Sequence, residues 1–238
     1  MINDNFCMTK ILAIGAHPDD IEFGCAPLLI KEVKKGNQVK IVVASLGEAG
    51  TSGTPKARKK EAENAAKIIG AEIKFINLGG DSHIEYKPQN AFKIAEILRK
   101  YKPDIVLAPS LAENQHPDHL NLAKLTRDAS RFSRYGGLRE LKQFKPHKIS
   151  ALYYYGSSAE WDKKPDILID VTENEALWKK TMESHKSQMK TKHYSQIILS
   201  KAAALGASMG VKLAIGLFSN DPIRLNYLSD ITLSSRNY

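Results

Sequence analysis

Two short clusters of histidine and aspartate contain the residue types best suited to chemistry. One is AHPDD at residues 16–20, and the other is HPDH at residues 116–119. Two histidines and a carboxylate with an open position make a typical catalytic zinc site. The spare carboxylate and imidazole would then be free for acid–base work. The alternative is that both clusters are turn and helix-cap residues, because Asp favours caps and Pro favours first turns.

The surrounding elements decide whether the clusters can meet. Short β-rich runs alternate with longer amphipathic stretches, which predicts βαβ units and a parallel sheet. The expected strands are 10–15, 38–44, 72–78, 103–109, 149–155 and 166–171, and the expected helices are 21–35, 55–69, 88–101, 117–131, 174–190 and 195–205. Each cluster follows a strand, and parallel sheets bind ligands at the carboxyl ends of their strands. We therefore expect both clusters on one edge of one sheet, which argues against the capping alternative.

The predicted fold class is α/β, a Rossmann-like and mostly parallel sheet flanked by helices. No internal repeat, low-complexity tract or linker divides the 238 residues. We expect one domain over 1–238, with a core near 10–132 and a C-terminal elaboration near 133–238. A nucleotide-binding Rossmann domain would carry Gly-x-Gly-x-x-Gly after its first strand, where this chain has AHPDD.

Composition is that of an ordinary globular protein, 42% hydrophobic and 26% charged. A chain of this length buries roughly 70% of the surface of its unfolded form, so a metal would serve chemistry rather than folding. Two cysteines are too few for a disulfide framework. Residues 1–10 lack the pattern of a secretory signal, and no apolar run approaches the ~18 residues that span a bilayer. We expect a cytoplasmic protein that starts at Met1 or Met8.

The net charge of +9 concerns partners and solubility rather than fold. It fits a solvated surface with scattered lysines, and it also fits attraction to an acidic small molecule. Nucleic acid is not an expected partner, because no helix-turn-helix, zinc-finger or aromatic-rich RNA motif accompanies the charge. A membrane partner is not expected either.

The pairing of AHPDD with HPDH resembles the zinc-dependent N-acetylglucosamine deacetylases of the LmbE-like, PIG-L superfamily. The resemblance includes the loop at 50–54 followed by Arg58 and Glu61, and the glycine-rich turn before Asp81. It also includes the stretch at 164–172 and the sequence HKSQ at 185–188. Within the superfamily it is nearest to the bacillithiol-pathway deacetylases, which remove acetyl from N-acetylglucosaminyl malate.

The resemblance implies one zinc ion per chain, held by His17, Asp20 and His119. Asp19 matches the general base, which takes a proton from a zinc-bound water. His17 and Asp20 are three residues apart, so a turn into a helix can present both to one ion.

Other matches imply roles around the metal. His116 matches the residue that stabilises the oxyanion or protonates the leaving amine, and Asp118 matches its orienting partner. Arg58 matches a substrate-binding arginine, whose planar fork can grip a carboxylate or phosphate. Asp81 and Tyr194 are further candidates for substrate binding.

Two departures from the family pattern bear on substrate choice. Ser82 stands where close relatives of the bacillithiol enzyme often have arginine. Leu213 and Ile215 lie where the family commonly shows Tyr-Ala-Glu. These changes leave the metal ligands and the base intact and affect the contacts to the group carried by the sugar.

The expected function is therefore zinc-dependent removal of acetyl from an N-acetylglucosamine conjugate, with N-acetylglucosaminyl malate as a candidate substrate. The expected partner is a small N-acetylated amino sugar, and the expected assembly is a homo-oligomer. The alternatives are a deacetylase of another N-acetylglucosaminide, a non-catalytic carbohydrate- or nucleotide-binding protein on the same scaffold, and a phosphoesterase, which would favour two metals. A binding module has no need for Asp19, whereas a hydrolase does.

Overall fold

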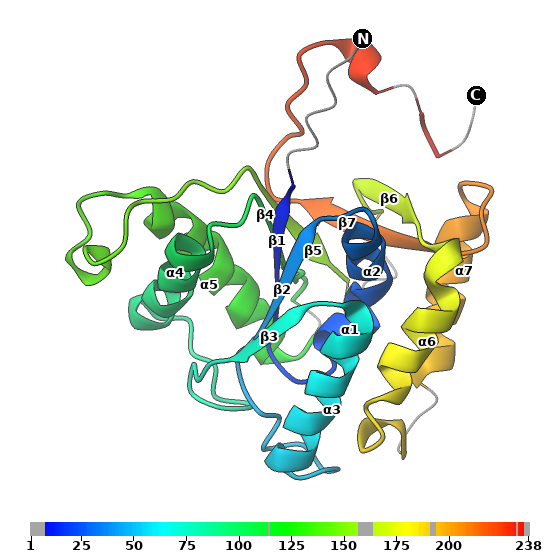
Figure 1. Ribbon diagram of the computed structural model, residues 1–238, viewed down its shortest axis with the longest axis horizontal. Coiled ribbons are helices and arrows are strands. Elements are labelled where there is room, and N and C mark those ends of the chain that lie inside the picture. The colour runs from blue at the N-terminus through cyan, green and yellow to red at the C-terminus, as the bar shows by residue number, and fades with distance from the viewer. Residues whose placement is uncertain (1–7, 114, 157–163, 191–193, 232, 236–238) are drawn as a thin grey trace.

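The computed structural model describes residues 8–113, 115–156, 164–190, 194–231 and 233–235 (Figure 1). Met1, one of the two expected starts, lies outside them. In the described residues, seven strands form a sheet in the order β3-β2-β1-β4-β5-β7-β6. The strands are β1 (Lys10–Gly15), β2 (Gln38–Val43), β3 (Glu72–Phe75), β4 (Ile105–Pro109), β5 (Ala151–Tyr155), β6 (Ile167–Asp170) and β7 (Ala214–Ser219).

The first five strands are parallel, which confirms the predicted α/β class. Strand β1 lies between β2 and β4, so that Ala13 is opposite Ile41 on one side and Leu107 on the other. From β1 the chain builds outward to β2 and β3, and then returns to place β4 on the other side. Such a reversal opens a crevice at the carboxyl ends of the two central strands.

Helices cover both faces of the sheet. Figure 1 shows α4 and α5 on one face, with α1, α2, α3, α6 and α7 on the other. Their bounds are α1 (Asp20–Gly24), α2 (Ala26–Lys34), α3 (Pro55–Ile69), α4 (Pro88–Tyr101), α5 (Pro117–Arg134), α6 (Glu175–Glu183) and α7 (Tyr194–Ala207). Because side chains alternate along a strand, β1 sends Ile11 and Ala13 into one hydrophobic core and Leu12 and Ile14 into the other. A strand buried on both faces explains the continuous apolar run.

The helix predicted at 21–35 is two helices, α1 and α2, separated at Cys25. Pro27 lies in the first turn of α2, where its missing N–H is tolerated, and this favours a new helix start. Gly24 ends α1 against the ring of Tyr155, and a Cβ there would lie 2.3 Å from that ring. The break is therefore fixed by packing between distant segments.

Strand β7 is absent from the sequence prediction, and it runs antiparallel to both β5 and β6. Gly216 interrupts its apolar pattern, and a Cβ at this position would lie 2.8 Å from Cβ of Pro165. The helix predicted at 174–190 is also shorter, because α6 ends at Glu183 and a turn follows. None of the helices in the described part of the chain is long and apolar enough to span a bilayer.

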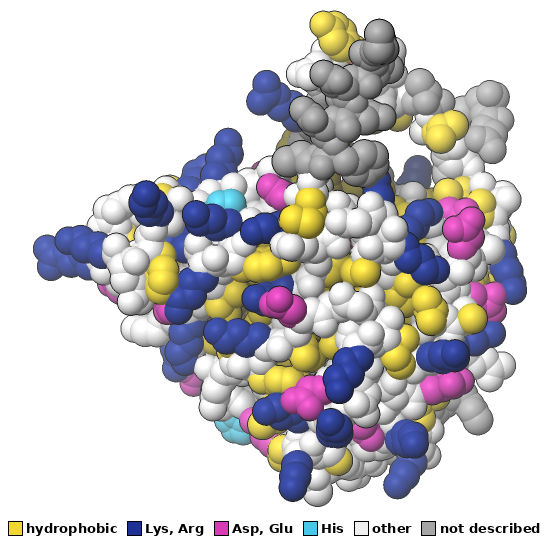
Figure 2. Space-filling model, in the orientation of Figure 1, with side chains coloured by type: hydrophobic (Ala, Val, Ile, Leu, Met, Phe, Trp, Pro, Cys, Tyr) yellow, Lys and Arg dark blue, Asp and Glu magenta, His cyan; other side chains and the backbone are white. Residues whose placement is uncertain are grey.

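The positive charge is dispersed over the face drawn in Figure 2. Lys and Arg side chains are spread across it, with acidic side chains between them. On this face the charge has the distribution of a solvated surface.

Candidate functional site

The two His/Asp clusters meet at the carboxyl edge of the central strands. Residues 16–20 link β1 to α1, and residues 116–119 begin α5 after β4. His17 and His119 are 102 positions apart in the sequence, yet Nδ1 of His17 lies 3.3 Å from Nε2 of His119. The parallel pairing of β1 with β4 brings them together.

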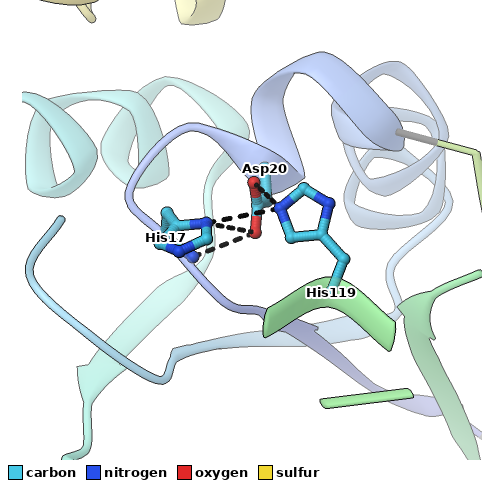
Figure 3. A group of neighbouring side chains, drawn as sticks. All are labelled: His17, Asp20 and His119. Carbon is cyan, nitrogen blue, oxygen red and sulfur yellow. Dashed lines mark hydrogen bonds and ion pairs between the residues drawn. The ribbon is translucent and has the colours of Figure 1, made fainter. Parts of the chain in front are cut away.

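His17, Asp20 and His119 form a compact set of possible metal donors. Figure 3 shows their side chains pointing toward one another, and one donor atom from each lies within 4.8 Å of the other two. Nε2 of His119 is 3.0 Å from Oδ1 of Asp20, and Nδ1 of His17 is 3.7 Å from Oδ2 of Asp20. Two imidazoles and one carboxylate, brought together in this way, are suited to zinc.

A second set with this spacing contains His17, His116 and Asp118. It shares His17 with the first set. The carboxylate of Asp118 already accepts two backbone N–H groups, from Ser82 at 2.7 Å and from Ile84 at 3.2 Å. Both carboxylate oxygens of Asp118 are thus engaged by backbone, whereas Oδ1 of Asp20 is directed at Nε2 of His119, so the first set is better suited to hold an ion.

The turn after β1 is built to present Asp20. Its Oδ2 accepts hydrogen bonds from the backbone N–H groups of Ala16 at 2.7 Å and His17 at 2.9 Å. Asp19, between Pro18 and Asp20, has a φ of 120°. A residue with a side chain rarely adopts this conformation, which costs on the order of 1–3 kcal/mol and persists only where the surroundings enforce it. Strain of this kind is common at functional sites.

Arg58 is the group that encloses this turn. Its terminal nitrogens donate to the carbonyl oxygens of Gly47 at 2.8 Å and Pro18 at 3.1 Å, and one lies 3.5 Å from Oδ2 of Asp19. Only 5% of Arg58 is exposed. Among the described residues, its Nε has no hydrogen-bond partner. Arg58 was expected to bind an acidic group of the substrate. In this structure its guanidinium group instead contacts the turn that carries Asp19.

Asp118 holds His17 rather than the residue expected from the family resemblance. Its Oδ2 is 3.1 Å from Nε2 of His17, whereas its contact with His116 is through the backbone, from N–H of Asp118 to Nδ1 of His116 at 3.2 Å. Asp81, expected to bind substrate, also faces His17, with Oδ1 3.1 Å from Nε2. The carboxylates of Asp118 and Asp81 therefore both contact Nε2 of His17. This fixes the orientation of the ring, and Nδ1 is directed at Asp20 and His119.

The carboxylates around His17 make the site favourable for a positive charge. Burial alone would lower the pKa of His17, but hydrogen bonds and charge interactions with Asp118, Asp20 and Asp81 raise that pKa to about 10. Burial would also raise the pKa of Asp20, yet His119 and His17 hold that pKa well below its usual value. Such an excess of negative charge is suited to a divalent cation.

The electrostatics of Asp19 differ from those of Asp20. Burial, followed by the charge of Asp20, raises the pKa of Asp19 to about 7, although His185 and Arg58 act in the opposite direction. The two adjacent aspartates are therefore placed in distinct environments. Such a separation of pKa values is typical of acid–base pairs in active sites.

His116 lies beside the donor set, whereas Tyr194 packs against α1. The ring of His116 is exposed and meets the ring of His17 edge-on, with 4.7 Å between centroids. Burial of one side of the ring and the nearby His17 lower the pKa of His116. Tyr194 begins α7, and its ring lies 5.9 Å from that of Phe23 on α1.

Behind the site lies a buried pair, of which the sequence singled out His185 through the HKSQ motif but not Glu22. Nε2 of His185 lies 3.3 Å from Oε2 of Glu22, and His185 is 0% exposed. Glu22 follows Asp20 by two residues, and His185 opens the HKSQ sequence. For Glu22 the available signal was a charged residue inside a short, mostly buried helix. For His185 the signal was the HKSQ motif.

The chain is similar to known proteins over most of its described length. The family profile described as "PIG-L: GlcNAc-PI de-N-acetylase" matches residues 12–130, half of the chain, including both clusters. The 4-oxalmesaconate hydratase of Pseudomonas putida is 24% identical over 237 residues, and the match covers 89% of this chain and 87% of the hydratase. The diacetylchitobiose deacetylase of Thermococcus kodakarensis is 28% identical over 200 residues, and the match covers 79% of this chain and 73% of the deacetylase.

Solved structures show the same fold. A conserved protein from Thermus thermophilus superposes with a TM-score of 0.82 at 27% identity, covering 92% of this chain and 97% of that one. The matched segment runs from β1 into α5 and contains all three donor residues and Asp19. The chain therefore belongs to the PIG-L family of GlcNAc-PI de-N-acetylases.

Proposed function

We propose that the protein is a zinc-dependent hydrolase that removes the acetyl group from an N-acetylglucosamine conjugate. The observation that carries the proposal is the placement of Asp19 directly beside the converging donors His17, Asp20 and His119. Membership of a deacetylase family supports the reaction class.

The donor residues fit zinc because they combine two imidazole nitrogens with a carboxylate, and because further carboxylates nearby favour a positive charge. When bound, zinc supplies a Lewis acid for the amide carbonyl and lowers the pKa of water. Asp19 would take the proton of the attacking water, a role supported by its place beside Asp20 in the turn and by its pKa, which burial and the charge of Asp20 raise to about 7. Arg58 fixes the turn that carries Asp19.

His116 is placed to serve the amide oxygen and the leaving amine. Because its Nδ1 accepts the N–H of Asp118, its proton resides on Nε2 in the neutral ring. The Nε2–H group can then donate to the developing oxyanion, a contribution of about 3 kcal/mol for one well-placed donor. Protonated His116 would also be the proton source for the departing amine.

The sugar conjugate is assigned only by class. N-acetylglucosaminyl malate is a candidate because of the family resemblance. An Arg58 side chain free to bind the malate carboxylates would have supported this substrate. Arg58 instead contacts Gly47 and Pro18. Substrates without an acidic group, such as N,N'-diacetylchitobiose, are therefore equally good candidates.

Hydration of a carbon–carbon double bond is a second candidate, because the relative from P. putida is a hydratase and aligns over 89% of this chain. A metal site with a neighbouring carboxylate base can also activate water for such an addition. Release of acetate distinguishes the two candidates, because a deacetylase produces it and a hydratase does not.

The test is a panel of substrates with two readouts on zinc-loaded protein. Free amine and acetate are measured for N-acetylglucosamine, N,N'-diacetylchitobiose and N-acetylglucosaminyl malate, and loss of the double bond is followed by ultraviolet absorbance for 4-oxalmesaconate. The proposal expects equal amounts of amine and acetate from at least one sugar. Hydration of the unsaturated acid without amine release from any sugar would replace it with the second candidate.

A homo-oligomer is also proposed. Large hydrophobic side chains are exposed in the C-terminal segment, which Figure 1 shows leading away from the sheet: Ile223, Leu225, Tyr227, Leu228, Ile231 and Leu233. Soluble monomers rarely expose such clusters. Light scattering of the full chain tests this proposal, and a monomer at micromolar concentration would contradict it.

A further inference from the structure

The turn at residues 185–188, called here the HKSQ turn, joins three parts of the site. Its Ser187 donates two hydrogen bonds to Glu61 on α3, from N to Oε1 at 2.9 Å and from Oγ to Oε2 at 2.6 Å. Its Gln188 donates from Nε2 to the carbonyl oxygen of Ser52 at 2.8 Å. Its His185 faces Glu22 on α1. The turn therefore contacts α1, which begins at Asp20, the loop before α3, and α3 itself.

The loop before α3 is packed tightly against this turn. Gly53 has a φ of 85°, and a Cβ added to it would lie 2.6 Å from Cβ of Ser187 and 3.2 Å from Cγ of Arg58. The backbone therefore passes between Ser187 and Arg58 with no room for a side chain. Any displacement of Ser187 changes the space that the loop and Arg58 occupy.

Glu61 and Arg58 lie three residues apart on α3, and so on the same side of the helix. Arg58 in turn holds the carbonyl oxygen of Pro18 and lies beside Asp19, whose backbone is strained. Ser187 is thus bonded to Glu61 on α3 and packs, across Gly53, against Arg58, which reaches Asp19.

We propose that Ser187 and Glu61 form a clasp that positions Arg58, and through it Asp19, for the reaction. This inference rests on the proposed function, because it assigns Asp19 a role in catalysis. Ser187 and Glu61 are positioning residues, and they act without contacting substrate. Displacement of a reacting group by about 1 Å can cost on the order of a hundredfold in rate, so a clasp of two short hydrogen bonds is sufficient to affect turnover.

Three variants test the clasp. Glu61→Ala removes both hydrogen bonds to Ser187, and Ser187→Ala removes the one from Oγ while it keeps the backbone N–H. Glu61→Gln keeps the length of the side chain, an acceptor for N–H and a donor for Oγ. One matched control is Glu63→Ala, because Glu63 lies on the same helix and is 4.0 Å from the ammonium groups of Lys59 and Lys60. The other is Ser184→Ala, because the Oγ of Ser184 donates to the carbonyl oxygen of Lys180 within its own helix end.

We expect Glu61→Ala to lower kcat/KM by about ten- to a hundredfold, mainly through kcat, with zinc content unchanged. Ser187→Ala should give a smaller loss, and Glu61→Gln should restore most of the activity. The two controls should match wild type. A loss in Glu61→Ala that Glu61→Gln does not restore would overturn the proposal, as would full activity in Glu61→Ala.

A double-mutant cycle separates positioning from general stability. Since the clasp acts through Arg58, Glu61→Ala should cost little more once Arg58→Ala is present. Losses that multiply in the double variant would show that Glu61 acts independently of Arg58 and would contradict the clasp.

Hydrogen exchange of the amides at 47–53 gives a readout that needs no turnover. Exchange should become at least about tenfold faster in Glu61→Ala and Ser187→Ala but not in Glu63→Ala. Unchanged exchange would overturn the clasp even if the enzyme were an active deacetylase. Faster exchange in a protein that hydrolyses no sugar amide would retain the structural link and reject the proposed function.

Discussion

Asp118→Asn changes the carboxylate that holds His17 while it preserves size and shape. The carboxylate accepts from three donors: Nε2 of His17 at 3.1 Å and the backbone N–H groups of Ser82 and Ile84. Burial would raise the pKa of Asp118, but the hydrogen bonds from His17 and Ser82 lower it. Asp118 is therefore ionised at neutral pH, and the substitution removes a full negative charge.

The amide of asparagine cannot replace all three bonds. If its oxygen stays with His17 and Ser82, its NH₂ group faces the N–H of Ile84, and two donors then oppose one another. The ring of His17 loses a charged partner, so its orientation is less fixed and its Nδ1 is a weaker ligand. Loss of such a partner behind a metal-binding histidine typically lowers metal affinity by about 10–100-fold. This corresponds to about 1.4–2.8 kcal/mol.

The assay is a zinc titration of metal-free protein in competition with a coloured chelator. Asp118→Asn should show a Kd for zinc raised by the factor above, with unchanged helix content by circular dichroism. Asp128→Asn is the matched control, since Asp128 lies on the same helix and bonds to the hydroxyl of Tyr86 instead. A Kd for Asp118→Asn within twofold of wild type would refute the idea that Asp118 supports His17 as a ligand.

Three further outcomes are expected. His119→Ala should lose most bound zinc and all deacetylation yet stay folded, and equal zinc occupancy by mass spectrometry in variant and wild type would reject His119 as a ligand. Asp19→Asn should keep zinc while kcat falls by about 10²–10⁴-fold, and near-normal kcat in a steady-state assay would exclude a general base there. Arg99→Lys, far from the site, should lower the free energy of unfolding by about 2 kcal/mol or more, because the buried guanidinium donates to five carbonyl oxygens at 132–144. Chemical denaturation measures that loss, and an unchanged midpoint would argue against a structural role.

The general fold was predictable from the sequence because its signals are local. Buried parallel strands appear as short apolar runs, and Thr54, Pro55 and Gly70 mark the two ends of α3. The two clusters were predictable as one site because each directly follows a strand, and neighbouring parallel strands end at the same edge.

The features that the sequence did not predict depend on contacts between distant residues. The break between α1 and α2 involves the ring of Tyr155, and β7 forms by pairing with strands that precede it in the chain. Asp118 lies within reach of both His116 and His17, and only the packing of the turn at 82–84 shows which ring its carboxylate faces. Arg58 could have pointed outward, but the loop at 47–53 encloses it.

Zinc dependence is the central claim, and a titration of activity with metal tests it most directly. Protein freed of metal with a chelator is given increasing zinc, and acetate release is measured at each step alongside bound zinc. We expect no acetate without metal and a linear rise that ends at one zinc ion per chain, whereas His119→Ala should lose most of the zinc binding and all of the acetate release. Full acetate release by metal-free protein, or a rise that ends only at two zinc ions per chain, would contradict the single site of His17, Asp20 and His119.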